Sequence, residues 1–590
     1  MNHSDRAGAP VRSLSGLVLP LAGALVLSAC ANTGDDQTAS PTDDCRGAVE
    51  GAGGCADGDD AGGGGAGGSR LSEPHDSKGK VEVTLHPGPG AAIGRPTVVT
   101  FGAPFPPGAL VDAGQLAAFD EDGAELEIHS AEILPWRAWP GTGGASPSVR
   151  SALVSVQVTF ADETPLAITL AYGEEPHATL AGQEKADPRA DWVAVTDGEY
   201  PDGTVREPPV YATFPPEWLG DCQLRTRTTA AGSDPDWAWF DDSMIGSAHT
   251  AVNDVPGSVK ELVPFASDAE PWLFDRSATL FGVYVRTGDV EWLRRAHRAA
   301  QFYAAHIDGD GYFDLVGDDD LKYSYGRSLV MDYQLTGDPA LVDATVRVAA
   351  AGAEWDPTYD LDTSFWTERH QTYALLAALS AWEATGEDRY ADRAREVAED
   401  SFAMAADPAG SWHADGCLLH GMTAHEGAGG DEPICSPWMS ALFADAVWEY
   451  FIHTADPAAL DFLAGLAHYV ADDGLYGGGD GLDLTMPWYL ASSVKTFSDD
   501  GPYGDVEHTC DVAGLVARGA WAEKQQGGDP GELRAVAEKL LEGCKWDLES
   551  WHRPDAPALG KSEWRLSPPR KFSWWFGTTS DLPWLMEESA

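Results

Sequence analysis

The chain has 590 residues, of which 43% are hydrophobic, so it is long enough for about two or three domains and a large core. It carries 38 Lys and Arg against 94 Asp and Glu, a formal net charge of −56. A surface this acidic excludes general binding to nucleic acid or to anionic membranes, because both need a basic field. The charge balance favours a salty or extracellular setting.

The first 30 residues have the pattern of a secretion signal. Arg6 and Arg12 precede an apolar run from Leu14 to Leu27, which is short for a membrane span. The motif Leu27 to Cys30 resembles the bacterial lipoprotein lipobox, which implies that Cys30 is lipidated. An ordinary signal peptide that contains a cysteine is the alternative. We expect a protein of the bacterial cell envelope, lipid-anchored at the outer membrane or cell surface, or secreted, with membrane contact only through the anchor.

Residues 31–80 are rich in Gly, Asp, Ser and Thr, which predicts a flexible linker. The chain has eight cysteines, so seven remain when Cys30 is set aside, and at least one of them is unpaired in the monomer. Two pairs are candidates for disulfides: Cys417 with Cys435, and Cys510 with Cys544. No Cys-x-x-Cys spacing typical of a metal site is present, and we expect neither a metal nor a cofactor.

A β domain is predicted over residues 81–209. Apolar and polar residues alternate along 81–85 and 126–128, residues 98–101 form a short β-branched run, and 153–160 form the longest strand candidate. Clusters of Pro, Gly and Asp between these runs are turn signals. We expect a β-sandwich or a small barrel.

Two segments of this region carry a family resemblance. Phe101 to Leu110 (FGAPFPPGAL) is followed by a strand and an Asp-x-Asp-Gly turn, and Ser148 to Leu153 leads into the long strand. The series resembles the first domain of the exo-rhamnogalacturonan lyase/YetA-like family. The resemblance implies a β domain followed by an (α/α) toroid lyase domain.

Residues 210–265 form an aromatic connecting segment that contains Trp218, Trp237, Trp239 and Phe240. Exposed tryptophans suit stacking on sugar rings, whereas buried ones belong to the core, and we favour the core.

Residues 266–590 are predicted to form the (α/α) toroid catalytic domain. Paired helices turn at a recurring Thr-Gly-Asp-like signal, which indicates a repeat of helical hairpins. An open solenoid is the competing layout, but the long intervals after Ala405 and Val470 favour a toroid with functional loops. A sixth hairpin is a candidate near 486–496, and 564–584 is expected to pack back on the domain. The five clear pairs are 273–288 with 290–306, 325–337 with 340–351, 368–386 with 389–405, 438–454 with 458–470, and 506–526 with 530–546.

In a toroid the first helix of each hairpin lines the centre, so polar residues at the starts of these helices are candidates for the site. The catalytic candidates are His370, Arg369, Tyr373, Tyr323, Tyr325, Arg327 and His508. The candidates for substrate binding are Asn253, Glu368, Trp438, Glu507 and His425.

This set of residues suits β-elimination at a uronic acid, in which a weakly acidic proton beside a carboxylate is removed. A cation neutralises the carboxylate and stabilises the enolate-like intermediate, a role for Arg327 or Arg369. His370 is expected to act as base or carboxylate clamp, and a tyrosine (323, 325 or 373) as acid or base. His370 and Tyr373 share a helix face at a spacing of three, and Arg369 can meet Tyr373 at a spacing of four.

We therefore predict a polysaccharide lyase whose partner is an acidic polysaccharide, with the arginines supplying a local basic field. A toroid glycoside hydrolase is the first alternative, and it needs two facing carboxylates, such as Glu368 with Glu507 or Asp511. A surface lipoprotein that binds glycans at Trp-rich clefts without turnover is the second. For each polar or tyrosine candidate the competing interpretation is ordinary packing or a solvated helix end.

Overall fold

The computed structural model describes residues 75–137, 148–182, 187–195, 205–251, 265–359, 367–408, 412–422, 430, 432–478, 481–498, 501–553, 566 and 568–590, which belong to one compact unit. The predicted signal sequence with Cys30, nearly all of the predicted linker, Asn253 and His425 lie outside the described residues. Within these ranges no helix combines the length and apolar content needed to cross a membrane.

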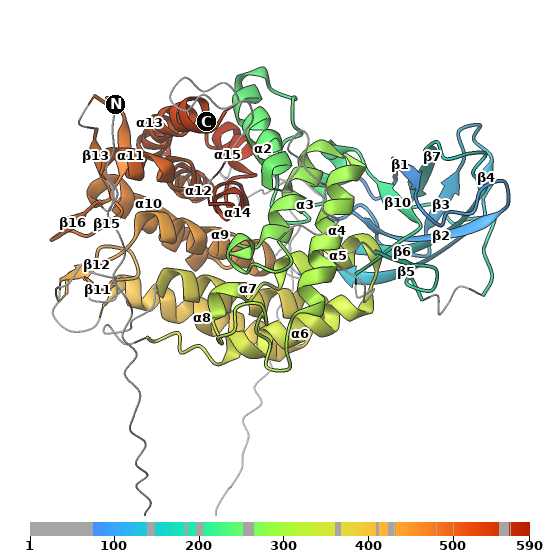
Figure 1. Cartoon of the computed structure of the whole chain (residues 1–590), viewed down its shortest axis with the longest axis horizontal. Helices are drawn as coiled ribbons and strands as arrows, with labels where there is room; N and C mark the ends of the chain where they lie inside the picture. Colours follow the sequence, from blue (N-terminus) through green and yellow to red (C-terminus); the bar gives the residue numbers. More distant parts are fainter. Residues whose placement is uncertain are drawn as a thin grey trace, which may run out of the picture. The chain divides into compact units, whose positions relative to one another are not determined.

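The N-terminal part consists of antiparallel sheets (Figure 1). One sheet has five strands in the order β10-β1-β7-β3-β4, a second has three in the order β2-β6-β5, and β8 pairs with β9. The strands are β1 (Gly79–Pro87), β2 (Thr97–Pro104), β3 (Leu116–Phe119), β4 (Glu125–Leu126), β5 (Ile128–Pro135), β6 (Val149–Val158), β7 (Leu166–Tyr172), β8 (Val193–Ala194), β9 (Arg206–Glu207) and β10 (Val210–Thr213).

The alternation seen in the sequence places one face of β1 in the core. Val81, Val83 and Leu85 are buried while Glu82 between them is exposed. β1 pairs with β7 on one side and with β10 on the other, where Leu85 lies opposite Ala212. The five-stranded sheet therefore extends past the predicted boundary at residue 209.

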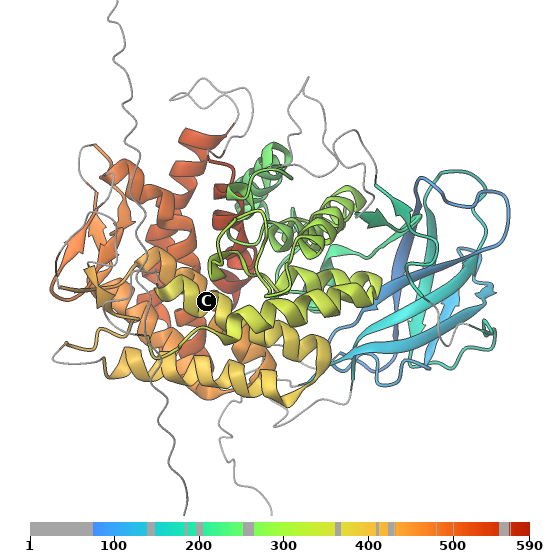
Figure 2. The ribbon, with the colours of Figure 1, turned by 60° about the horizontal axis from the view of Figure 1, so that its bottom comes forward.

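Twelve helices in the C-terminal part form six hairpins. Their first members contact one another in the order α3, α5, α7, α9, α12 and α14, and α14 returns to α3, which closes the ring (Figures 1 and 2). A closed ring fits the predicted toroid and excludes the open solenoid. The hairpins are α3 (Arg276–Thr287) with α4 (Val290–Ala305), α5 (Arg327–Thr336) with α6 (Pro339–Ala353), α7 (Thr367–Thr385) with α8 (Asp388–Ala406), α9 (Pro437–Thr454) with α10 (Pro457–Asp473), α12 (Thr509–Gln525) with α13 (Gly531–Asp547), and α14 (Lys571–Gly577) with α15 (Leu582–Glu588).

The Thr-Gly-Asp signal has a direct physical cause at the α3–α4 turn. The hydroxyl of Thr287 donates to the carbonyl of Val283, and Gly288 takes a left-handed φ of 67° that ends the helix. Asp289 then accepts the amide of Glu291 and caps the next helix. One tripeptide thus closes one helix and opens another.

The prediction of a helical hairpin near 486–496 was wrong. Residues 485–497 form short strands, β14 (Thr485–Pro487), β15 (Leu490–Ala491) and β16 (Thr496–Phe497), in place of a sixth helical hairpin. Pro487 lacks the amide that a helix interior needs, and β14 pairs instead with β13 (Leu475–Gly477). The sixth hairpin is the aromatic α14–α15 pair.

The connecting segment contains the helices α1 (Pro216–Asp221) and α2 (Ala238–Ala251). Its aromatic residues pack against the core, as we favoured.

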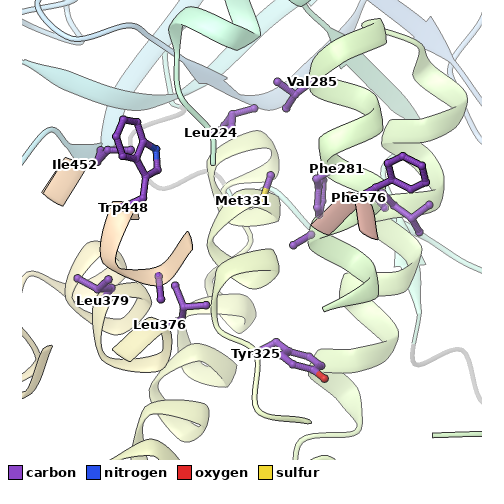
Figure 3. Close-up of a cluster of buried hydrophobic side chains, with 14 of the residues drawn as sticks. Leu224, Phe281, Val285, Tyr325, Met331, Leu376, Leu379, Trp448, Ile452 and Phe576 are labelled. Carbon is purple, nitrogen blue, oxygen red and sulfur yellow. The ribbon is translucent and has the colours of Figure 1, made fainter. Parts of the chain in front are cut away.

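Apolar side chains fill the interior of the ring (Figure 3). Phe281 of α3, Met331 of α5, Leu376 of α7, Trp448 of α9 and Phe576 of α14 all belong to this buried cluster. Both expected disulfides are present: Cys417–Cys435, which ties a loop to the start of α9, and Cys510–Cys544, which joins α12 to α13.

Candidate active site

The starts of several inner helices meet at one end of the ring. The charged groups around the Tyr323 hydroxyl are Asp320, Glu270, Arg369 and Arg570. Burial raises the pKa of this hydroxyl most, the two carboxylates raise it further, and the two arginines lower it. These residues come from four separate segments of the chain. Of the predicted site residues, this group brings Tyr323 and Arg369 together.

Arg369 lies in the first turn of α7. Unlike the other cations near it, it forms no salt bridge with a carboxylate among the described residues. Its guanidinium makes neither a hydrogen bond nor an ion pair there, and its Nε is buried. The other three cations are paired, Lys322 with Asp320 at 2.6 Å, Arg570 with Glu270 at 2.7 Å, and Lys571 with Glu507. Burial lowers the pKa of Arg369, and Asp320 and Tyr373 oppose this shift. An unpaired, half-buried guanidinium is suited to bind an anionic group.

Two tyrosines beside Arg369 have hydroxyls that make no hydrogen bond with the described part of the chain. Tyr373 lies one helical turn below Arg369 on α7, and Tyr323 ends the short 3-10 helix Leu321–Tyr323. Burial raises the pKa of both hydroxyls, and the guanidinium of Arg369 opposes this rise. Both hydroxyls therefore stay protonated at neutral pH and are available as donors.

Tyr325 lies in the same cluster but is fully engaged. Its ring packs edge-on against Tyr373 at 5.1 Å. Its hydroxyl donates to the carbonyl of Lys322 at 2.7 Å and accepts the amide of Phe274 at 2.9 Å. Tyr325 therefore connects the backbone at Lys322 to the backbone at Phe274 and has a structural role.

His370 is buried and lies between an acid and an aromatic ring. Its Nε2 is 3.6 Å from Oδ1 of Asp320, and its ring lies 5.1 Å from that of Trp355. Burial raises the pKa of Asp320, but hydrogen bonds from His370 and Lys322 outweigh burial and hold this pKa well below its usual range. The Asp320 carboxylate can therefore orient and charge-balance the imidazole.

Arg327 is engaged in a buried ion network. It pairs with Asp445 at 2.7 Å and with Glu449 at 2.5 Å. Burial alone would raise the pKa of Asp445, but Arg327 and two further arginines, Arg225 and Arg518, hold it well below its usual range. Because its charge is already balanced inside the ring, Arg327 has none to offer a substrate.

His508 belongs to an aromatic group with Trp438 and Trp574. Its ring lies 4.7 Å from Trp438 and 4.4 Å from Trp574, and Nδ1 is 3.7 Å from Asp511. Asp511 accepts the indole N–H of Trp574 at 2.8 Å. Trp438 and His508 are both buried, so the group is part of the packed interior.

The carboxylates proposed for hydrolysis are held in separate contacts. Glu368 has no exposed surface and accepts the backbone amide of Ser436 at 2.7 Å. Glu507 is paired with Lys571, and Asp511 with Trp574. The structure therefore does not present Glu368 to the opening as one of two facing carboxylates.

Sequence reasoning missed Asp275, which lines a cavity of about 20 Å³ under the site. Phe274, Arg327, Tyr373 and Asp445 line the same cavity. Asp275 caps α3 by accepting the amide of Ala278, and an Asp just before a helix is a recognisable capping signal. The predicted helix began at Leu273, which hid that signal. No group of three metal-binding side chains occurs in the described ranges.

No family model and no curated protein matches this chain. Among solved structures it is similar to an inactive variant of the α-1,6-mannanase of Salegentibacter sp. HEL1_6, with 12% identity over 59% of this chain and 98% of that one and a TM-score of 0.36. It is similar to the unsaturated glucuronyl hydrolase of Streptococcus agalactiae, with 12% identity, coverage of 58% and 92%, and a TM-score of 0.39.

A third similarity is to the cellobiose 2-epimerase of Bacillus thermoamylovorans B4167, with 11% identity, coverage of 58% and 100%, and a TM-score of 0.39. Similarities at this level assign neither an activity nor a substrate to this chain.

Proposed function

We propose that the protein is a carbohydrate-active enzyme that cleaves a uronic-acid-containing glycan by β-elimination. The observation that carries the proposal is the unpaired guanidinium of Arg369 beside two tyrosine hydroxyls that have no hydrogen bond in the described chain. A planar guanidinium binds a planar carboxylate through two parallel hydrogen bonds. Within the described ranges, Arg369 forms no salt bridge with a protein carboxylate, so this capacity is available to a ligand.

The roles follow from the surroundings of each group. Arg369 neutralises the uronate carboxylate and stabilises the negative charge that develops as the neighbouring C–H proton leaves. His370, oriented by Asp320 at 3.6 Å, takes that proton. Tyr373, kept protonated by burial, gives its proton to the departing glycosidic oxygen.

The charge distribution at the opening supports an acidic substrate despite the net charge of the chain. Lys322 and Arg570 are balanced by Asp320 and Glu270, so the positive charge near Tyr323 that is left for a substrate belongs to Arg369. Charges beyond about 8 Å are strongly screened at physiological ionic strength, so the distant acidic surface weighs little against this local charge. Hydrolysis is disfavoured because Glu368, its first candidate carboxylate, is inaccessible.

The test uses the full chain on a panel of uronate polysaccharides, following both the ultraviolet absorbance of unsaturated uronate and the release of reducing ends. We expect both signals to rise together for the wild type. Arg369→Gln should lower kcat/KM by about a hundredfold or more, the usual effect of losing one group that stabilises the developing charge. The control is Arg389→Gln, which removes an arginine that is 64% exposed and paired with Glu387, and it should leave the rate unchanged.

The other outcomes separate the alternatives. Reducing ends without the absorbance would identify a hydrolase. Retention on a polysaccharide column without turnover would identify a binding protein. Equal rates for Arg369→Gln and the wild type would remove Arg369 from the site.

A further inference from the structure

We infer that Asp275 returns a proton to Tyr373 after Tyr373 has donated its own. The proton passes through the small cavity that both residues line. The inference rests on the proposed function, because it gives Tyr373 the role of acid. Asp275 is buried, so it acts through Tyr373 and is a positioning residue in that sense.

The backbone at Asp275 is the first observation. Asp275 has a φ of 53° and the preceding Phe274 a φ of 73°, so two consecutive residues that are not glycine adopt the left-handed region. Such a conformation persists only where its surroundings enforce it, and it is frequent at functional sites. Asp275 in this conformation lines the cavity, and its carboxyl accepts the amide of Ala278.

The cavity is the second observation. Its volume of about 20 Å³ is enough for one water molecule and far too small for a sugar ring. Tyr373 of α7 lines it too, and among the described residues no hydrogen-bond partner of the Tyr373 hydroxyl would compete for that water. A single water can therefore connect the carboxyl to the phenol.

Electrostatics fits this role. Burial raises the pKa of Asp275, while the Ala278 amide, the Ser328 hydroxyl and the cations Arg327 and Arg225 lower it in part. The remaining groups that face Asp275 or share its cavity are Tyr303, Tyr325, Tyr373 and the carboxylate Asp445. The net rise favours a protonated carboxyl, which is the state a donor needs.

The proton count closes. Tyr373 gives its proton to the glycosidic oxygen as the C–O bond breaks and the oxygen keeps the electron pair. The Asp275 carboxyl then passes a proton through the water to the tyrosinate, and the carboxylate regains one from solvent after product leaves. The proton that His370 took from carbon is released to solvent, so no proton is gained or lost over a turnover.

Asp275→Asn separates this role from helix capping, because Asn caps helices as well as Asp and tolerates the left-handed region. We expect unchanged thermal stability, a kcat lower by about a hundredfold, and a KM within about twofold of wild type. In the wild type the rate should fall as rising pH deprotonates Asp275, and the variant should lack this fall. Asp289→Asn, at the cap of α4, is the matched control and should keep both rate and profile.

Two further measurements keep the inference falsifiable. In a Tyr373→Phe background, Asp275→Asn should cause no additional loss, because the two residues act in one path. The infrared difference between wild type and Asp275→Asn near neutral pH should contain the carbonyl band of a protonated carboxyl, whether or not the protein turns over. A wild type inactive on every uronate would end the proposed function alone, whereas a missing band, an unaltered pH profile or additive losses would overturn the role of Asp275.

Discussion

At the scale of single residues, Tyr325 and Tyr373 have the same side chain but different hydrogen bonding. Tyr325 and Tyr373 are both buried, and their rings touch. The Tyr325 hydroxyl is saturated by the Lys322 carbonyl and the Phe274 amide, whereas the Tyr373 hydroxyl makes no hydrogen bond within the described residues. A satisfied hydroxyl stabilises the fold, and an unsatisfied one beside a cavity is available for chemistry.

This difference predicts opposite effects for two equivalent substitutions. Tyr325→Phe leaves the buried amide of Phe274 without an acceptor and should lower the free energy of unfolding by about 1–3 kcal/mol. Tyr373→Phe breaks no protein hydrogen bond, so it should leave stability nearly unchanged while lowering kcat by about a hundredfold or more. Denaturant unfolding and rate assays on both variants test this. A stable, inactive Tyr325→Phe and an unstable, active Tyr373→Phe would reverse the assignment.

At the scale of elements, the turns between paired helices are the most regular feature of the chain. Gly288, Gly337, Gly386 and Gly527 all have a left-handed φ at the end of an inner helix, and Ala455 takes the same conformation at the fourth turn with a φ of 56°. A residue with a Cβ is strained by about 1–2 kcal/mol in the left-handed conformation. Glycine avoids this strain but lowers stability by about 0.4–1 kcal/mol, because it gives the unfolded chain more conformational entropy. The strain is the larger effect.

Ala455→Gly should therefore stabilise the protein by about 0.5–1 kcal/mol. The reciprocal control is Gly527→Ala, where an added Cβ meets no atom within 4 Å, so only the backbone strain is measured. It should destabilise by a similar amount. Calorimetry on both variants checks the sign, and a loss of stability in Ala455→Gly would show that the Ala455 methyl contributes packing that outweighs its strain.

The same turns explain how far the sequence could be interpreted. Thr-Gly-Asp is a local signal, since all of its hydrogen bonds lie within a few residues, so the five helical pairs were predicted to within a few residues. The sixth pair lacks that signal and begins in an aromatic stretch, Lys571 to Phe576, that could equally have been a surface segment. Local signals predict helices well, but they do not show which helix closes a ring.

The site was predictable only in part, for a related reason. The position of Arg369 in the first turn of an inner helix follows from the sequence. That Arg327 is neutralised by Asp445, 118 residues away, whereas Arg369 has no such partner, depends on contacts between distant helices. The sequence places charges on helices, and only the fold shows which of them cancel.

At the scale of the whole molecule, the segments that carry the family resemblance lie where the sheets meet the ring. Gly102 in the first segment is required because a Cβ there would lie 2.2 Å from the carbonyl oxygen of Gln334 at the end of α5. In the second segment, Ser151 donates to the same carbonyl at 2.6 Å, and Arg150 pairs with Glu383 of α7 at 2.6 Å. These residues specify a junction between two layers of the fold, which is why they predict architecture and leave the substrate open.

Arg150 is the residue on which this junction most depends. Its guanidinium lies 4.2 Å over the ring of Trp136, and it also donates to the carbonyl of Gln223 at 3.1 Å. Burial raises the pKa of Glu383, and Arg150 opposes that rise. Removing the arginine leaves a buried carboxylate that is near the charge of Arg137 and accepts a hydrogen bond from the Gln334 amide at 3.1 Å.

Arg150→Met should therefore cost about 3–5 kcal/mol, the usual result of breaking one side of a buried pair. The cost should grow as pH rises above the ordinary range of a glutamate, because the unfolded chain then releases a proton that the folded variant retains on Glu383. Adding Glu383→Gln should recover most of the loss and abolish its pH dependence, since no charge is left to bury. Urea unfolding of the single and double variants across acid and neutral pH measures both effects. A loss that persists in the double variant would assign the junction to the stacking of Arg150 on Trp136 and not to its charge.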